Sequence, residues 1–245
     1  MPYREVLPGI IWIDLPWTNV WLLYDGNRSS LIDTGTCHDR SAVLADLSHA
    51  LPDGCRITDV YLTHGHCDHA GNAAFLCENF GANLSVGKEE VPFVATRKTY
   101  IPPGVRAIGL RGLIFAGSEI IFPVKRRPVD VCVLDGDTVD SPIGPLTAIH
   151  TPGHTIGHMS YYHSSRKILF SGDALLTVIP FIRKGGLSIA PSFFSVDRSA
   201  AVRSIHRLAE LEPDAILAGH GWPVTESATS SLHAYARSLR TNGAG

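Results

Sequence analysis

The stretch "YLTHGHCDHAGN", Tyr61 to Asn72, places three histidines and one aspartate within six residues, directly after an apolar run. Side chains two residues apart in an extended segment point to the same side, so His64 and His66 are able to chelate one ion together. Asp68 and His69 follow where the chain turns into a helix, and they are able to face a second ion beside the first. Nitrogen and oxygen ligands without thiolate suit zinc, and also iron or manganese.

A polar surface loop is the alternative interpretation of this stretch. A single His-x-His pair would favour that alternative. Four ligand-type residues at this spacing, immediately after a predicted buried strand, favour a metal site instead. Four ligands do not complete two open catalytic sites, so the sequence predicts that further ligands lie elsewhere in the chain.

Three other segments offer ligands, each on a turn after an apolar strand, where loops present functional groups on a rigid sheet. They are "TPGHTIGH" with His154, "LFSGDALL" with Asp173 and "ILAGHGWP" with His220. For any one of these residues, an ordinary turn position is the alternative. Four strand-end segments that together supply nitrogen and oxygen ligands are much less common by chance than one such turn residue. The residues themselves do not assign His154 or His220 to a particular ion.

Short runs of β-branched and aromatic residues between turns predict strands at residues 9–15, 20–25, 29–33, 57–63, 131–140, 146–150, 158–163, 167–173 and 214–219. Apolar residues at helical spacing predict helices at 38–51, 71–81, 199–213 and 226–240. Mixed elements with two groups of strands indicate an α/β or α+β fold with sheets packed in layers. We expect one domain over residues 1–245, with an excursion at about 87–130 that is a candidate for shaping a substrate pocket.

The composition is that of a globular protein with a sizeable core: 44% of the 245 residues are hydrophobic and 18% are charged. The net charge of −2 gives no basic excess, so we expect no nucleic-acid partner. Five scattered cysteines without paired spacing argue against a disulfide framework. We find no signal-peptide pattern and no uninterrupted apolar span, so we expect no membrane association and a cytoplasmic location.

The motifs "THGHCDHAGN", "TPGHTIGH", "FSGDAL" and "AGHG", in this order and after an upstream "LIDTG", resemble those of the metallo-β-lactamase-fold hydrolases. The resemblance covers the chain from about Val6 to Trp222. It implies a four-layer αββα sandwich with the site at the edge of the two sheets. It also implies one ion held by His64, His66 and His154, a second held by Asp68, His69 and His220, and Asp173 as the bridge between them. Asp33 in "LIDTG" matches a family position that supports the ligands from behind.

The function implied is a dinuclear hydrolase with two divalent ions, for which zinc is the first choice and iron or manganese are alternatives. A metal-bridging hydroxide would cleave a carboxylic thioester, ester or lactone of a small acyl substrate. We expect Asp68 to be the catalytic side chain, orienting the hydroxide and passing its proton to the leaving group. Cys67 needs no catalytic role and is expected to be a small buried packing residue. His158 is a candidate for supporting the ligands.

The chain departs from several known subgroups of that family. True β-lactamases of the fold lack the bridging aspartate, whereas Asp173 is present here. Glyoxalase II enzymes carry a long C-terminal extension and a substrate-binding tyrosine, but only 25 residues follow His220 and Trp222 stands near the tyrosine position. Quorum-quenching lactonases carry a tyrosine shortly after the bridging aspartate, and "GDALLTVIPF" has none. A phosphodiester hydrolase and a mononuclear iron sulfur dioxygenase are the alternative functions, and a non-catalytic binding protein ranks last because no ligand is missing.

The segment 177–195 is a second candidate for shaping the pocket. Its aromatic residues Phe181, Phe193 and Phe194 beside Arg183 and Lys184 would suit an apolar acyl or ring group with a nearby negative charge. Core packing with two solvated charges is an equally good interpretation. The sequence leaves the oligomeric state open, a homodimer included. Five other histidines, His38, His49, His163, His206 and His233, are expected at the surface, and Tyr161 and Tyr162 are expected to pack on a strand.

Overall fold

Short strands rich in isoleucine, valine, leucine and tryptophan pair into a first sheet. In the computed structural model, which describes residues 3–96, 121–179 and 184–239, this sheet has seven strands in chain order. They are β1 (Tyr3–Leu7), β2 (Ile10–Asp14), β3 (Asn19–Asp25), β4 (Arg28–Ile32), β5 (Arg56–Tyr61), β6 (Asn83–Gly87) and β7 (Val131–Val133). The first four are antiparallel neighbours, and β4 to β7 are parallel neighbours.

Parallel neighbours need crossover connections, and helices supply them. Helix α1 (Arg40–Ala50) joins β4 to β5, while α2 (Cys67–Ala70) and α3 (Ala73–Phe80) join β5 to β6. After β6 the chain forms the 3-10 turn η1 (Lys88–Glu90) and helix α4 (Val91–Ala95). Helix α3 ends at Gly81, whose φ of 69° is the left-handed conformation that glycine adopts without strain. The predicted helices at 38–51 and 71–81 are therefore confirmed.

The second sheet has five strands in the order β14-β11-β10-β9-β8. They are β8 (Thr138–Val139), β9 (Leu146–His150), β10 (Met159–His163), β11 (Ile168–Gly172) and β14 (Ala215–Ala218), with η2 (Ser164–Arg166) between β10 and β11. The parallel pair of β11 and β14 is connected through the hairpin β12 (Leu176–Ile179) and β13 (Lys184–Ser188), the turn η3 (Ser192–Phe194) and helix α7 (Arg198–Ala209). Helix α8 (Ala228–Ser238) follows β14.

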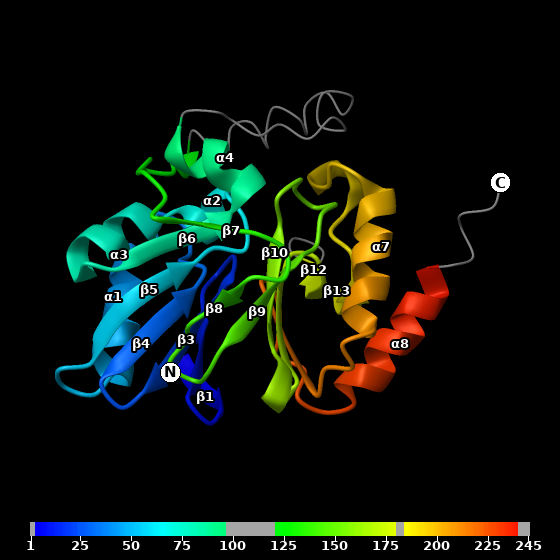
Figure 1. Cartoon of the computed structure of the whole chain (residues 1–245), viewed down its shortest axis with the longest axis horizontal. Coiled ribbons are helices and arrows are strands. Elements are labelled where there is room, and N and C mark those ends of the chain that lie inside the picture. Colours follow the sequence, from blue (N-terminus) through cyan, green and yellow to red (C-terminus); the bar gives the residue numbers. More distant parts are fainter. Residues whose placement is uncertain (1–2, 97–120, 180–183, 240–245) are drawn as a thin grey trace.

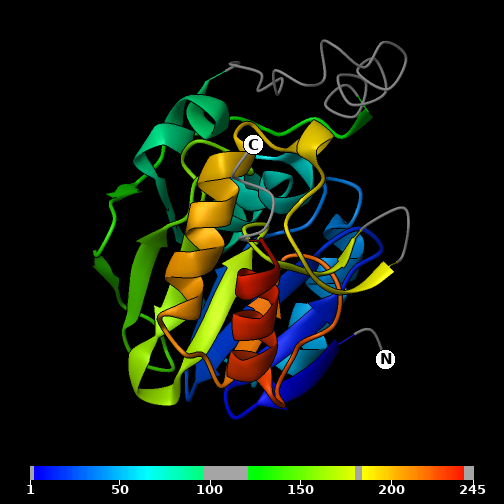
Figure 2. The same cartoon turned by 90° about the vertical axis from the view of Figure 1, so that its right-hand side faces the viewer.

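The two sheets stack between two helical layers, with α1 and α3 on one outer side and α7 and α8 on the other (Figure 1). Seen from the second side, α7 and α8 lie across the face of the second sheet (Figure 2). Three buried clusters match the three contacts between layers. One packs Leu47 and Leu76 against the first sheet, one joins Trp21 to Phe170 between the sheets, and one packs Leu208 against the second sheet. The predicted αββα sandwich is confirmed.

Four expectations need correction. The strand predicted at 131–140 is two short strands, β7 in the first sheet and β8 in the second. Strand β5 ends at Tyr61, so His64 and His66 lie in a loop beyond the strand rather than at its extended end. His163 is buried, and its Nε2 lies 2.8 Å from the carbonyl oxygen of Ile143, so the surface prediction is wrong for this histidine. Cys67 is half-buried rather than buried.

The remaining side-chain predictions concern four histidines and two tyrosines. His38 and His49 are exposed, while His206 and His233 are half-buried. Tyr161 and Tyr162 are buried on β10, as predicted for packing residues.

The predicted excursion at 87–130 is described at its two ends. Its first residues pack on the core, because Phe93 and Val94 of α4 are buried. Its last residues return beside α3, where Lys125 Nζ lies 2.5 Å from Glu78 Oε2. Residues 97–120 lie outside the described part. Within the described ranges, each helix is too short or too polar to span a bilayer.

Candidate metal centre

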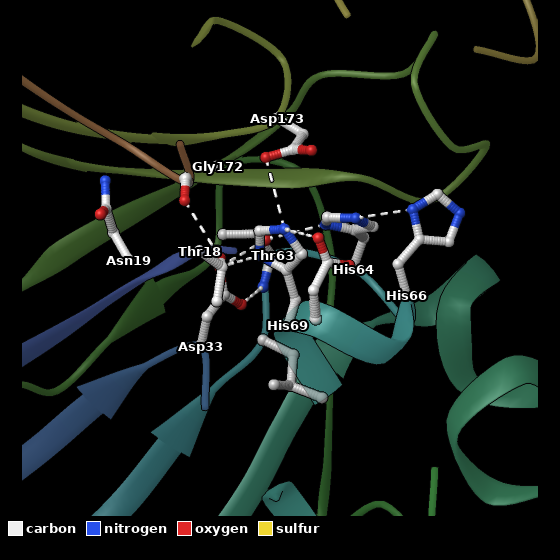
Figure 3. Close-up of polar contacts among 12 residues, drawn as sticks. Thr18, Asn19, Asp33, Thr63, His64, His66, His69, Gly172 and Asp173 are labelled. Carbon is white, nitrogen blue, oxygen red and sulfur yellow. Dashed lines mark hydrogen bonds and ion pairs between the residues drawn. The ribbon is translucent and has the colours of Figure 1, made fainter. Parts of the chain in front are cut away.

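Four loops converge at one edge of the sandwich and bring all seven predicted ligands together. The loop after β5 and helix α2 carry the first four, and the loops after β9, β11 and β14 carry one each. The cluster consists of His64, His66, Asp68, His69, His154, Asp173 and His220. Ligands from both sheets therefore meet in one cluster, and Figure 3 shows several of them with their neighbours.

His64, His66 and His154 form the first triad of ring nitrogens. His64 Nε2 lies 3.0 Å from His66 Nδ1, and His154 Nε2 lies 3.0 Å from His66 Nδ1 and 3.2 Å from His64 Nε2. A tetrahedral zinc ion with nitrogens at 2.0–2.1 Å keeps those nitrogens about 3.3 Å apart, so the spacing is close to that of a metal site. Each neutral imidazole has one lone pair and one N–H, so three converging nitrogens suit a shared cation.

The protonation state of the first triad fits that role. Burial lowers the pKa of His66 to about 4 and holds the pKa values of His64 and His154 well below their ordinary value. Burial has this effect because the charged imidazolium loses its hydration in the protein interior. The three rings are thus neutral at pH 7, which is the form that ligates a metal.

Asp68, His69 and His220 form the second triad. His69 Nε2 lies 3.8 Å from Asp68 Oδ2 and 3.4 Å from His220 Nε2, and His220 Nε2 lies 3.5 Å from Asp68 Oδ2. The two histidines are buried, whereas the side chain of Asp68 is 28% exposed. Among the seven ligand-type residues, Asp68 is thus a carboxylate that both faces the cluster and reaches toward solvent.

Asp173 lies between the two triads. Its Oδ2 is 3.5 Å from His154 Nε2 and 3.1 Å from His220 Nε2, and its Oδ1 is 3.4 Å from His69 Nε2. Although burial opposes its ionisation, the neighbouring rings of His220 and His69 hold the pKa of Asp173 well below its usual range. An ionised carboxylate in this position is able to serve both triads at once.

Gly219 allows the loops that carry these ligands to meet. A Cβ atom at position 219 would lie 2.8 Å from His69 Cε1 and closer still to the carboxylate of Asp173. Because real Cβ atoms do not approach neighbours so closely, a larger residue would push the ligands apart.

Asp33 fixes the orientation of two histidines from behind. His69 Nδ1–H donates to Asp33 Oδ2 at 2.8 Å, and the hydroxyl of Thr63 donates to the same oxygen at 2.8 Å. The hydroxyl oxygen of Thr63 in turn lies 3.0 Å from His64 Nδ1, from which it accepts. With Nδ1 directed at these oxygens in both rings, the Nε2 atoms of His64 and His69 face the cluster. Figure 3 shows His69 between Asp33 and Asp173.

His158 supports Asp173 through the backbone. The main-chain N–H of Asp173 donates to His158 Nε2 at 2.9 Å, so the other ring nitrogen carries the proton and faces Thr151 Oγ1 at 2.8 Å. Burial lowers the pKa of His158 to about 3, so the ring stays neutral and keeps the lone pair that this contact needs. The expectation that His158 supports the ligands agrees with this contact.

Two supporting residues carry no motif that sequence reasoning could use. Glu90 is buried and accepts hydrogen bonds from the main-chain N–H groups of Gly65 and Gly157. Asn19 donates to the carbonyl oxygens of Ala218 and Gly221, and thereby holds the loop that carries the last histidine ligand. Each partner is a backbone atom far away in sequence, which leaves no local pattern.

The segment 177–195 borders the second triad at its start. Thr177 Oγ1 lies 3.0 Å from the carbonyl oxygen of His220 and 2.8 Å from that of Trp222. Residues 180–183, which include Phe181 and Arg183, lie outside the described residues, as do the side chains of Lys184 and Phe193. The predicted apolar pocket with two basic residues therefore stays a prediction.

Comparison with known proteins agrees with this geometry. Residues 18–220 match the family model described as "Metallo-beta-lactamase superfamily". A probable metallo-hydrolase of Bacillus subtilis, YflN, is 32% identical over 234 residues, which cover 90% of this chain and 87% of that protein. A hydroxyacylglutathione hydrolase of Pseudomonas aeruginosa (strain LESB58) is 32% identical over 160 residues, which cover 64% of this chain and 46% of that protein.

Solved structures share the fold. A subclass B3 metallo-beta-lactamase of Bradyrhizobium japonicum, BJP-1, superposes with a TM-score of 0.71 at 20% identity, covering 98% of this chain and 91% of that one. A metallo-beta-lactamase family protein of Thermus thermophilus, TTHA1429, gives a TM-score of 0.64 at 22% identity, covering 96% of this chain and 81% of that one. At these identities the likeness concerns the fold alone.

Proposed function

The chain belongs to the metallo-β-lactamase superfamily, and on that premise we propose that it is a dinuclear metal-dependent hydrolase of a small carboxylic thioester, ester or lactone. The hydrolase class is supported by relatives named as a probable metallo-hydrolase and as hydroxyacylglutathione hydrolase. The observation that carries the dinuclear proposal is the position of Asp173. Its two carboxylate oxygens lie 3.1–3.5 Å from ring nitrogens of both triads, as a bridging ligand requires.

The proposed ligand sets follow the two triads. His64, His66 and His154 would hold one divalent ion, Asp68, His69 and His220 would hold the other, and Asp173 lies within reach of both groups. Nitrogen and carboxylate donors in this number favour zinc, and iron or manganese accept the same donors. Such a pair of ions supplies an activated water near neutral pH and polarises the carbonyl oxygen of a substrate.

Asp68 is the proposed catalytic residue, because it is the partly exposed carboxylate of the cluster. One of its oxygens, Oδ2, faces His69 and His220. With the side chain 28% exposed, the carboxylate is able to orient an attacking water and to carry its proton to the leaving group.

An apolar substrate is supported by the side chains around the site. Trp17, Ile156 and Trp222 are 46%, 46% and 65% exposed, and each lies on a loop that carries a candidate ligand or is hydrogen-bonded to such a loop. The loops of Trp17 and Trp222 are joined, because Thr18 donates to the carbonyl oxygen of Gly219 at 3.0 Å. Exposed aromatic side chains beside a polar cluster are typical of sites that bind an apolar group next to the reacting atoms.

Metal analysis combined with a substrate panel tests the proposal. Protein reconstituted with zinc, manganese or iron should bind about two ions per chain and hydrolyse thioesters, esters or lactones. Asp68→Ala should lose the hydrolysis, whereas Asp53→Asn, an exposed aspartate on a turn, should keep it. Fewer than one ion per chain would contradict the proposal. Turnover confined to phosphodiesters, or oxygen uptake with a persulfide by a one-iron form, would replace it with the corresponding alternative.

A further inference from the structure

We propose that Glu90 is a positioning residue that sets the distance between the two loops of the first triad, and that it thereby controls metal binding at His64, His66 and His154 selectively. The inference rests on the proposed dinuclear function. Glu90 lies in the turn η1, outside every segment that supplies a ligand, and it is 1% exposed. A carboxylate this deeply buried has to be matched by donors.

Two main-chain donors to this carboxylate come from the ligand loops. The main-chain N–H of Gly65 donates to Glu90 Oε2 at 2.9 Å, and the main-chain N–H of Gly157 donates to Oε1 at 3.0 Å. Gly65 stands between the two histidines of the loop after β5, and Gly157 stands three residues after His154. One carboxylate therefore joins a loop of the first sheet to a loop of the second.

The contacts around the carboxylate leave little freedom. A Cβ atom at Gly157 would lie 2.7 Å from the main-chain nitrogen of Glu90, and one at Gly65 would lie 3.2 Å from Glu90 Oε2. Two residues from each of these glycines, the main-chain N–H of Met159 at the start of β10 donates to the carbonyl oxygen of Thr63 at 2.8 Å. The two loops are thus joined twice, once through the backbone and once through Glu90.

The second triad has different supports. His69 is held by Asp33, and the loop of His220 is held by Asn19 through Ala218 and Gly221. Within the part of the chain that the structure describes, Glu90 makes no hydrogen bond to these supports. Loss of the Glu90 bridge should therefore weaken one ion and leave the other in place.

Glu90→Gln tests this selectivity with little change in shape. An amide offers one carbonyl oxygen and one NH2 group, so it satisfies one loop N–H and faces the other with a donor. Supporting groups behind metal ligands typically change metal affinity by about 10- to 100-fold. In competition titrations with a chromophoric zinc chelator, one of the two ions should lose about this factor. The exposed neighbour Glu89 provides the matched control, and Glu89→Gln should bind both ions as the wild type does.

The affected ion is identified in a His220→Ala background, which removes a ligand of the second triad. In that background, the affinity for the ion that remains should fall by the full factor expected for Glu90→Gln. Circular dichroism and thermal unfolding of the metal-free variants separate a positioning role from a general loss of stability. A folded Glu90→Gln variant that binds both ions normally, or that weakens both equally, would overturn the inference.

Glu90→Asp provides a second test of the inference if the Glu90→Gln variant does not fold. It keeps the charge but is one methylene shorter, so it cannot reach both loop N–H groups in this geometry. A selective loss at one ion supports the inference, and unchanged binding of both ions overturns it. If the wild type itself fails to bind two ions, the proposed function is refuted independently of Glu90.

Discussion

The Oδ2 atom of Asp33 and the Nδ1 atom of His69 lie 2.8 Å apart, with both side chains buried. This contact assigns the proton of His69 to Nδ1 and leaves Nε2 as the ligand atom. Asp33→Asn should weaken metal binding by about 10- to 100-fold, because an amide holds the ring less firmly in that tautomer. Isothermal titration with zinc measures the loss, and Asp53→Asn is the control on an exposed turn. Unchanged affinity would show that the ring is oriented without Asp33.

Metal affinity should rise with pH from neutral to about pH 10. Burial disfavours a charged ring at His69, but the carboxylates of Asp173 and Asp33 outweigh burial and raise its pKa to about 10. The metal-free protein therefore keeps a proton on His69 at pH 7, and an ion has to displace it.

Calorimetry in buffers of different ionisation enthalpy should detect at least one proton released per chain at pH 7. In the metal-free protein, the stabilising effect of protonated His69 should be complete below its ordinary pKa of 6.5 and lost as the pH rises to about 10. An affinity that is flat between pH 7 and 9 would contradict this expectation.

Gly219→Ala should disrupt the site, because a Cβ at this position would lie 2.8 Å from His69 Cε1. Overpacking of this kind typically costs about 1–3 kcal/mol. The Tm of the metal-free variant should be lower than that of the metal-free wild type. The zinc content of the reconstituted variant should also be lower. Gly185→Ala is the matched control, since its nearest neighbour would be Trp222 at 3.9 Å. Normal zinc content in Gly219→Ala would show that the loops adjust to the extra methyl group.

Metal removal should destabilise the whole fold, because the first triad joins His64 of one sheet's loop to His154 of the other's. Binding to the folded state alone adds about 4 kcal/mol to the free energy of unfolding when free ligand is 1,000 times the dissociation constant. Calorimetric scans with and without a chelator measure the difference in Tm. Equal Tm values in the two scans would argue against metal bound across the sheets.

The candidate ligands could be predicted from sequence because each one is a metal-binding residue type in a loop or short helix that follows a strand. The predicted strand before His64 and His66 extends too far, since β5 ends at Tyr61, although the backbone of His66 is extended. Their ring nitrogens still converge to 3.0 Å, because the loop leads directly into α2 at Cys67. The prediction that these ligand-type side chains converge therefore holds, although the strand ends earlier than predicted.

Two of the supporting residues, Glu90 and Asn19, could not be predicted in the same way. Glu90 and Asn19 bind backbone groups that lie 25 to 202 residues away in the chain, and a backbone partner has no residue type to recognise. The hairpin of β12 and β13 was also missed, because "KGGLS" carries two glycines where strand propensity would be expected. Long-range packing decides these features.

The candidate ligands of the two triads are completed at different positions along the chain. On the proposed assignment, the first triad is complete once residue 154 has left the ribosome, while the second waits for His220. His220 follows β14, which enters the second sheet last and in parallel with β11. On the proposed assignment, a chain truncated before β14 would therefore keep the ligands of the first triad and lose His220 from the second.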